Sequence, residues 1–220
     1  MLKIATALIV FLGGFAVMVL EVVGTRYLAK DFGDSFYVWI SQIGVILIAL
    51  ALGYSIGGSL ADRFRRTVFL AVPMAVAGLF IFFIPQLAPP LVKAITSRHH
   101  GTDVSALWDK LDPVMGSTVV FFLPCFVLAV ISPYMVRVAA RRLDRVGTTS
   151  GLIYAASTVG SIAGVFISGY IFIQYLSIPT IFQATGVVTL CLAALCLVMD
   201  KWLKAVEIGE AARQTEEATP

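Results

Sequence analysis

A single glutamate interrupts the first long apolar stretch of the chain, within the segment VMVLEVVGTRYLAKDFG that covers residues 17–33. The apolar run before Glu21 begins at Ile4, and a carboxylate is costly wherever such a run enters lipid. Gln42 lies at a similar expected depth in the next apolar stretch, so the carboxylate and the amide are expected to meet. Two hypotheses follow. Glu21, with Gln42 and aromatic rings such as Tyr37, holds a cation or proton, or the polar pair is a structural clamp between two helices.

The depth of Glu21 depends on where the first helix ends. Gly24 permits an end at that residue, which would place Glu21 roughly 4.5 Å inside the membrane boundary. Arg26 is then the nearest counter-ion by charge, although on a continuous helix it would project roughly 140° away from Glu21. We therefore expect Glu21 near the outer membrane surface.

No arrangement typical of a catalytic centre or a cofactor site is present elsewhere in the sequence. There is no Ser-His-Asp set, no zinc motif and no carboxylate pair on one face of a predicted helix. His99 and His100 are adjacent in a predicted loop, and no other ligand type is arranged near them. We expect no metal, no cofactor and no enzymatic activity in this chain.

The elements that must position these residues are membrane-spanning helices. Of 220 residues, 59% are hydrophobic and 13% charged, and the mean hydropathy is +0.94, which excludes a soluble domain of this size. Six stretches have the roughly 20 apolar residues that a span needs. They lie at about 4–24, 37–59, 67–92, 114–136, 150–174 and 178–199. The predicted fold class is all-α, with a transmembrane domain over 1–200 and a polar, disordered cytoplasmic tail over 201–220.

Lysine and arginine predict the orientation, because cytoplasmic loops retain positive charge. With the N-terminus inside, eleven basic residues lie on the inner side and five on the outer side. We expect both termini in the cytoplasm and the chain in a bacterial inner membrane. The basic residues follow this topology, so nucleic acid is not an expected partner.

The segment GYSIGGSLADRFRR at 53–66 follows the second predicted span. It resembles the cytoplasmic loop of major facilitator transporters, in which an aspartate four residues after a glycine precedes basic residues, although the glycine before the basic pair is missing here. The resemblance implies a latch at the inner membrane face. A basic anchor that obeys the charge rule is the alternative. The latch residues would be Gly58, Asp62, Arg63, Arg65 and Arg66.

Two stripes of small residues predict close helix contacts, either within the bundle or across a homodimer, because small side chains let backbones approach in lipid. The stripes are Gly53, Gly57 and Ala61 in the second stretch, and Ala156, Gly160, Gly164 and Ser168 in the fifth.

Two longer segments, LEVVGTRYLAKDFGDSFYVW with IGVILIALALGYSIGGSLADR, and GLIYAASTVGSIAGVFISGYIFI, extend the resemblance. They are similar to the membrane part of the fused major-facilitator and spermidine-synthase-like proteins, over most of residues 15–175. The positions on that pattern are Glu21, Arg26, Tyr37, Gly53, Gly57, Gly58, Asp62, Arg63, Tyr154, Ser157, Thr158, Gly160 and Gly164. The soluble aminopropyltransferase-like domain that the family usually carries has no counterpart after Met199.

The resemblance implies a facilitator-like half-transporter for a small organic cation such as a polyamine, acting as a homo-oligomer in the bilayer. The residues expected to face the cation are Glu21, Gln42, Tyr37, Tyr154, Ser157 and Thr158. The alternative is a scaffold that transports nothing and recruits a separate spermidine-synthase-like enzyme. That partner, or lipid headgroups, would meet Arg137, Arg141, Arg142 and Arg145.

Overall fold

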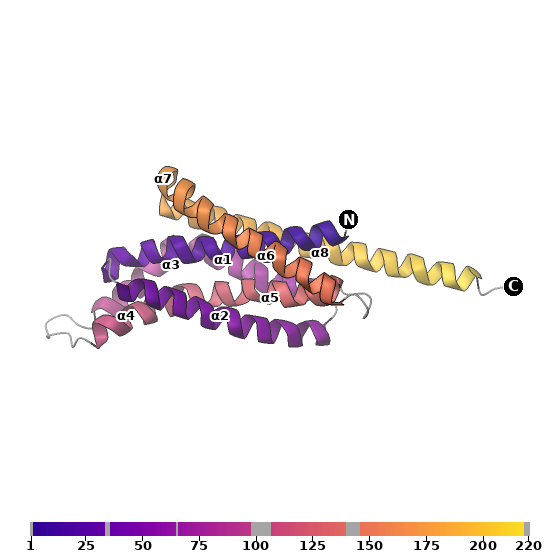
Figure 1. The fold of residues 1–220 in the computed structure, drawn as a ribbon, viewed down its shortest axis with the longest axis horizontal. Helices are drawn as coiled ribbons and strands as arrows, with labels where there is room; N and C mark the ends of the chain where they lie inside the picture. Colours follow the sequence, from indigo (N-terminus) through magenta and orange to yellow (C-terminus); the bar gives the residue numbers. More distant parts are fainter. Residues whose placement is uncertain (1, 34–35, 65, 98–106, 140–145, 218–220) are drawn as a thin grey trace.

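The computed structural model describes residues 2–33, 36–64, 66–97, 107–139 and 146–217, and for residues 2, 3, 109, 203 and 205–217 it describes the backbone only. All regular elements in these ranges are helical (Figure 1). In chain order they are α1 (Leu2–Phe32), α2 (Phe36–Arg63), α3 (Val68–Thr96), α4 (Trp108–Ser117), η2 (Thr118–Phe122), α5 (Leu123–Ala139), α6 (Val146–Ile167), η4 (Ser168–Phe172), α7 (Ile173–Tyr175) and α8 (Ile178–Glu217).

Six continuous helical spans in the described residues are long and apolar enough to cross a membrane. They are Ile4–Phe32, Phe36–Arg63, Val68–Thr96, Lys110–Ala139, Val146–Tyr175 and Ile178–Trp202. The chain is therefore a multi-pass integral membrane protein of the all-α class, which confirms the fold class predicted from the sequence. Both chain ends lie at one end of the bundle, called here the terminal side, and the other end is called the distal side (Figure 1).

Helix α1 does not end at Gly24, where the sequence predicts its end, but continues to Phe32. A Cβ atom at Gly24 would lie 2.5 Å from the Gln42 amide nitrogen and 2.8 Å from the Phe121 ring, so this glycine serves close packing. The helix ends at Gly33, whose φ of 84° lies in the left-handed region that glycine tolerates. Glu21 is thus far from either end of its helix.

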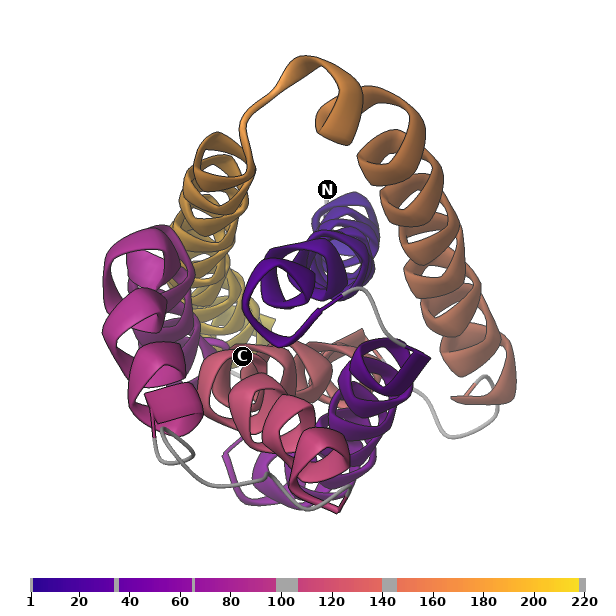
Figure 2. The same cartoon turned by 90° about the vertical axis from the view of Figure 1, so that its left-hand side faces the viewer.

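The helices pack as three main pairs, namely α1 with α6, α2 with α5, and α3 with α8. The pairing is symmetric between the two halves of the chain. If the first three spans are exchanged in order with the last three, the α1–α6 and α2–α5 pairs exchange places and the α3–α8 pair is unchanged. Helix α1 also contacts α2, α3, α4, α5 and α8, so it is the central helix of the bundle (Figure 2). Side chains on α1 therefore face other helices over most of its circumference.

Glycines bring the backbones together within each pair. A Cβ atom at Gly164 on α6 would lie 2.6 Å from the Phe15 carbonyl oxygen on α1, and Gly160 is packed against the Phe11 backbone in the same way. A Cβ atom at Gly53 on α2 would lie 2.6 Å from the Phe126 carbonyl oxygen on α5. In the described residues, the small-residue stripes thus make contacts within one chain.

The third pair uses glycines that the two predicted stripes do not include. A Cβ atom at Gly186 on α8 would lie 2.7 Å from the Phe82 nitrogen on α3, and one at Gly78 would lie 3.1 Å from the Gly186 carbonyl oxygen. All three helix pairs therefore depend on close backbone contact, as expected where lipid offers no hydrophobic drive for helix association.

Two features differ from a set of plain straight helices. The π-helical turn η2 ends two residues before Pro124, which has no N–H to continue the α-helical bonding. Helix α8 continues to Glu217, well beyond the other helices on the terminal side (Figure 1), although the sequence predicts a disordered tail from residue 201. This segment is rich in Ala, Glu, Lys, Arg and Gln, which favour helix over coil.

Candidate functional site

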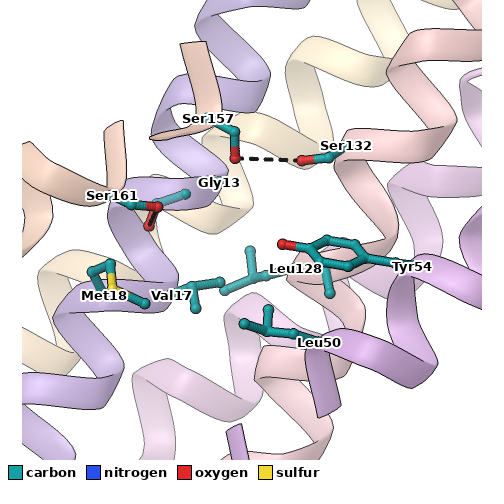
Figure 3. A pocket seen from close by; sticks show the side chains of 11 residues that line it. Gly13, Val17, Met18, Leu50, Tyr54, Leu128, Ser132, Ser157 and Ser161 are labelled. Atoms are coloured by element: carbon teal, nitrogen blue, oxygen red, sulfur yellow. Dashed lines mark hydrogen bonds between the residues drawn. The ribbon is translucent and has the colours of Figure 1, made fainter. Parts of the chain in front are cut away.

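A pocket with a volume of about 40 Å³ lies between α1, α2, α5 and α6 (Figure 3). Helices α2 and α6 make few or no contacts with each other, and the pocket lies between them. Residues of α1 and α5 complete its lining. All four helices contribute residues from the middle part of their spans. The lining residues are Gly13, Gly14, Val17, Met18, Leu50, Tyr54, Leu128, Ala129, Ser132, Ser157 and Ser161. The volume suffices for roughly two or three water molecules.

Four hydroxyl groups give the pocket its polar character. Ser132 Oγ on α5 lies 3.4 Å from Ser157 Oγ on α6, and Ser161 Oγ donates to the Gly14 carbonyl oxygen at 3.3 Å. The Tyr54 hydroxyl enters the same space from α2 (Figure 3). Hydroxyls both donate and accept hydrogen bonds, so the pocket can bind water or one end of a polar ligand at a depth where lipid offers no partner.

Glu21 lies close to the middle of its helical span. The span runs over Ile4–Phe32, so its centre falls at residue 18, about 4.5 Å along the helix axis from Glu21. At this depth an ionised carboxylate facing lipid would cost roughly 3 kcal/mol. The helix end at Gly24, on which the expectation of a shallow carboxylate depends, does not form.

The Glu21 side chain is on the pocket side of α1. Residues three and four apart share a helix face, and Glu21 follows the lining residues Val17 and Met18 by four and three positions. Helical side chains also tilt toward the N-terminus, which brings the carboxylate back toward the pocket. The carboxylate interacts electrostatically with the thiol of Cys125 on α5, one turn from the lining residue Leu128. Glu21 is not itself a lining residue, but it lies about one turn beyond Val17 and Met18 on the same face of α1, on the distal side of the pocket.

Glu21 is half-buried, and no ion pair or side-chain hydrogen bond of its carboxylate occurs within the described ranges. Only its backbone carbonyl is engaged, by the Thr25 hydroxyl at 2.8 Å. Arg26 is exposed and forms no ion pair with Glu21, because the uninterrupted helix turns the two side chains apart. The arginine that the sequence suggests as a counter-ion therefore does not serve as one.

Gln42 is fully buried and connects three helices. Its amide nitrogen donates to the Leu20 carbonyl oxygen at 3.4 Å, and its amide oxygen accepts a 2.5 Å hydrogen bond from Ser117 Oγ at the end of α4. The partner on α1 is thus a backbone group next to Glu21 and not the Glu21 carboxylate. Gln42 acts as a clamp, which corresponds to the structural hypothesis drawn from the sequence.

The remaining expected cation-binding residues are dispersed. Ser157 lines the pocket, but Tyr154 and Thr158 are exposed, and the Thr158 hydroxyl bonds to the Tyr154 carbonyl oxygen of its own helix at 2.9 Å. Tyr37 lies at the distal end of α2, with Lys110 Nζ 5.2 Å from the centre of its ring. Of the six residues expected to face the cation, Ser157 lines the pocket, Glu21 lies one turn from it on α1, and Tyr154 interacts electrostatically with the lining residue Tyr54. Gln42, Tyr37 and Thr158 lie elsewhere.

On the terminal side, the expected latch and partner residues partly pair with each other. Arg137 Nε on α5 donates to Asp62 Oδ1 on α2 at 2.9 Å, and both side chains are substantially exposed. Arg63 stacks on the Phe64 ring, and a Cβ atom at Gly58 would meet nothing within 4 Å. Arg65, Arg141, Arg142 and Arg145 lie outside the described residues.

The connection after α2 is fastened to α8 and α5. Arg66 pairs with Asp200 at 2.9 Å, and the same carboxylate accepts the Val68 backbone N–H at 3.4 Å, which caps α3. Thr67 Oγ1 donates to the Cys196 carbonyl oxygen at 3.0 Å. The buried Tyr134 hydroxyl bonds the carbonyl oxygens of Phe64 and, at 2.7 Å, Arg66.

Several site residues are not among those singled out from the sequence, namely Tyr54, Ser132, Ser161 and Asp200. A signal exists for the three hydroxyl residues, because each is a polar side chain in the middle of an apolar stretch. Ser161 also follows Ser157 by four positions and so shares its helix face. Asp200 has no such signal, since its pairing with Arg66 joins residues 134 positions apart.

No three metal-ligating side chains gather anywhere in the part of the chain that the structure describes. Comparison with protein-family models, with curated proteins and with solved structures finds no match to this chain.

Proposed function

We propose that this membrane protein binds and transports a small organic cation, with Glu21 as the anionic anchor. The observation that carries the proposal is the position of Glu21 near mid-span, beside a pocket with four hydroxyls and without a cationic partner in the described residues. An acidic side chain that faces a polar cavity inside a membrane is a default site for a cation or proton. The carboxylate provides the charge, and a bound ammonium group would replace the missing counter-ion.

The lining of the pocket suits an alkylammonium group. The serine and tyrosine oxygens can accept N–H donors, while Val17, Leu50 and Leu128 offer apolar wall to methylene groups. The family resemblance suggests a polyamine as the class of cation. The pocket of one chain can accommodate one charged end of such a cation and a short part of its alkyl chain.

The size of the pocket supports action as an oligomer. Pockets that enclose a whole ligand usually measure about 300–1,000 Å³, and this one has about 40 Å³. Two copies related by an axis along the membrane normal would join their half-sites into one larger cavity, as the two halves of a twelve-helix facilitator do. In this proposal each copy supplies one Glu21.

The proposed setting is a bacterial inner membrane with the terminal side in the cytoplasm, supported by the excess of lysine and arginine there. The Asp62–Arg137 and Arg66–Asp200 pairs would then lie at the cytoplasmic face, where the facilitator resemblance expects a latch.

Uptake of labelled putrescine and spermidine into proteoliposomes tests the proposal. Native protein should accumulate label, and Glu21→Gln, which keeps the size of the side chain and removes its charge, should not. Asp31→Asn is the matched control, because it removes an exposed acid from the end of the same helix, away from the pocket. Native protein that is folded but gives no uptake would contradict the proposal.

A scaffold that recruits a separate synthase-like enzyme is the second candidate. The observation in its favour is that Gln42, a fully buried polar group near Glu21, already has protein partners and holds helices together. Arg63 and Arg137 would contribute to the recruiting face. Copurification of a soluble synthase that is lost in Arg141→Ala/Arg142→Ala, together with absent uptake, would support this function over transport.

A further inference from the structure

We propose that Glu21 carries a proton while the pocket is empty and that the cation displaces this proton, so that proton release accompanies cation binding. The inference deepens the proposed function and partly rests on it. It names the proton as the ion exchanged at the same site. The exchange is balanced: the carboxylic acid and an ammonium ion give a carboxylate–ammonium pair, and one proton leaves to solvent.

The first step concerns charge. An ionised carboxylate without a counter-cation is strongly disfavoured away from water, and such groups become neutral instead. Glu21 is half-buried near mid-span, and neither Arg26 nor any other described cation pairs with it. In the empty pocket its neutral acid form therefore has the lower free energy.

The second step concerns the groups that face Glu21, since any of them could supply the missing charge. From α5 this is the Cys125 thiol, which is neutral or, if ionised, negative. From α2 and α6 the nearby pocket groups are the hydroxyls of Tyr54, Ser157 and Ser161. The other helices that contact α1 also carry described ionisable groups. Those toward the ends of their spans are Lys93 on α3, Asp112 on α4 and Asp200 on α8. Tyr170 in η4 and Cys191 on α8 are exposed, and Cys196 on α8 packs on Met74 toward the terminal side. Among the residues that the structure describes, no cation is placed to hold Glu21 ionised.

The third step concerns access, because a proton that exchanges needs a route. The pocket begins about one helical turn from Glu21, at Val17 and Met18 on the same face of α1, and has room for roughly two or three waters, which the four hydroxyls can hydrogen-bond. The Glu21 carboxylate has no hydrogen-bond partner among the described residues, whereas the Gln42 amide oxygen accepts a hydrogen bond from Ser117. A protonated Glu21 is thus able to give up its proton to pocket water when an ammonium group arrives.

Labelling with dicyclohexylcarbodiimide tests the protonated state without any cation. This apolar reagent adds to protonated carboxyl groups that it reaches from the membrane, and peptide mass spectrometry locates the adduct. Glu21 should be modified at neutral pH, more slowly as the pH rises and more slowly with putrescine present. Glu21→Gln should lack the adduct, and the exposed, paired carboxylate of Asp62 should react only with a water-soluble carbodiimide.

A proton-release measurement tests the exchange. Putrescine added to purified protein in weakly buffered detergent, with a pH indicator, should release about one proton for each Glu21 that binds an ammonium group. Binding without release, or a Glu21 that resists the apolar reagent throughout the pH range, would overturn the inference and leave the proposed cation site standing. Absence of putrescine binding together with labelling of Glu21 would instead overturn the proposed function and retain the proton site.

Discussion

Replacing Gly160 by alanine tests the packing that forms the pocket wall. A Cβ atom at this position would lie 2.7 Å from the Phe11 carbonyl carbon and 2.9 Å from its Cα atom, with the carbonyl oxygen nearer still. Ordinary contact begins at 3.4 Å, so α1 and α6 would have to separate by about 0.7 Å or more. The opposing atoms are backbone, and no side-chain rotation can relieve the overlap.

Gly151→Ala on the same helix is the matched control, because its Cβ atom would meet nothing within 4 Å. Both positions are inside α6, so the gain in helix propensity from alanine is similar and cancels in the comparison. Overpacking of this kind costs about 1–3 kcal/mol. Gly160→Ala should therefore be less stable than Gly151→Ala by about that amount.

Unfolding in mixed micelles, as the fraction of sodium dodecyl sulfate increases and far-ultraviolet circular dichroism follows helix content, would measure the difference. Equal midpoints and slopes for the two variants would refute the reasoning, because they would show that α1 and α6 do not meet at Gly160. A separation of α1 from α6 also moves Ser157 away from Gly14, so the variant should lose cation uptake along with stability.

Three further variants test the polar contacts by the same unfolding assay. Gln42→Leu removes two interhelical hydrogen bonds and should cost about 1–2 kcal/mol, and no loss would exclude the clamp. Asp200→Asn weakens the pair with Arg66 and the cap on α3, and should cost about 1–3 kcal/mol. Asp62→Asn removes an exposed pair with Arg137 and should cost less than about 1 kcal/mol, so a loss equal to that of Asp200→Asn would contradict the ranking.

The sequence predicts the spans well, because a run of about 20 apolar residues has few alternatives to a membrane helix. The predicted end of α1 at Gly24 is wrong because a glycine in a helix can either end it or allow close packing. Gly24 permits a helix end, but in the folded chain it makes room for Gln42 and Phe121, which cannot be known without the positions of α2 and η2. The depth assigned to Glu21 depends on this choice.

The site is predicted less completely than the fold. Glu21 and Ser157 are found from the sequence because a polar residue in an apolar run is conspicuous, or because the family resemblance includes it. The grouping of Ser132, Tyr54 and Ser161 with them depends on which faces of four helices meet. Residue spacing within one helix does not determine the rotation of another, so that grouping required the structure.

Equilibrium binding of labelled putrescine to the purified protein tests the central claim most directly. Loss of a charged contact is worth about 1.5–3 kcal/mol, so Glu21→Gln should weaken binding by roughly ten- to more than a hundredfold. Asp31→Asn, which removes an exposed acid at the end of the same helix, should bind as the native protein does. The account is contradicted if Glu21→Gln binds putrescine with native affinity.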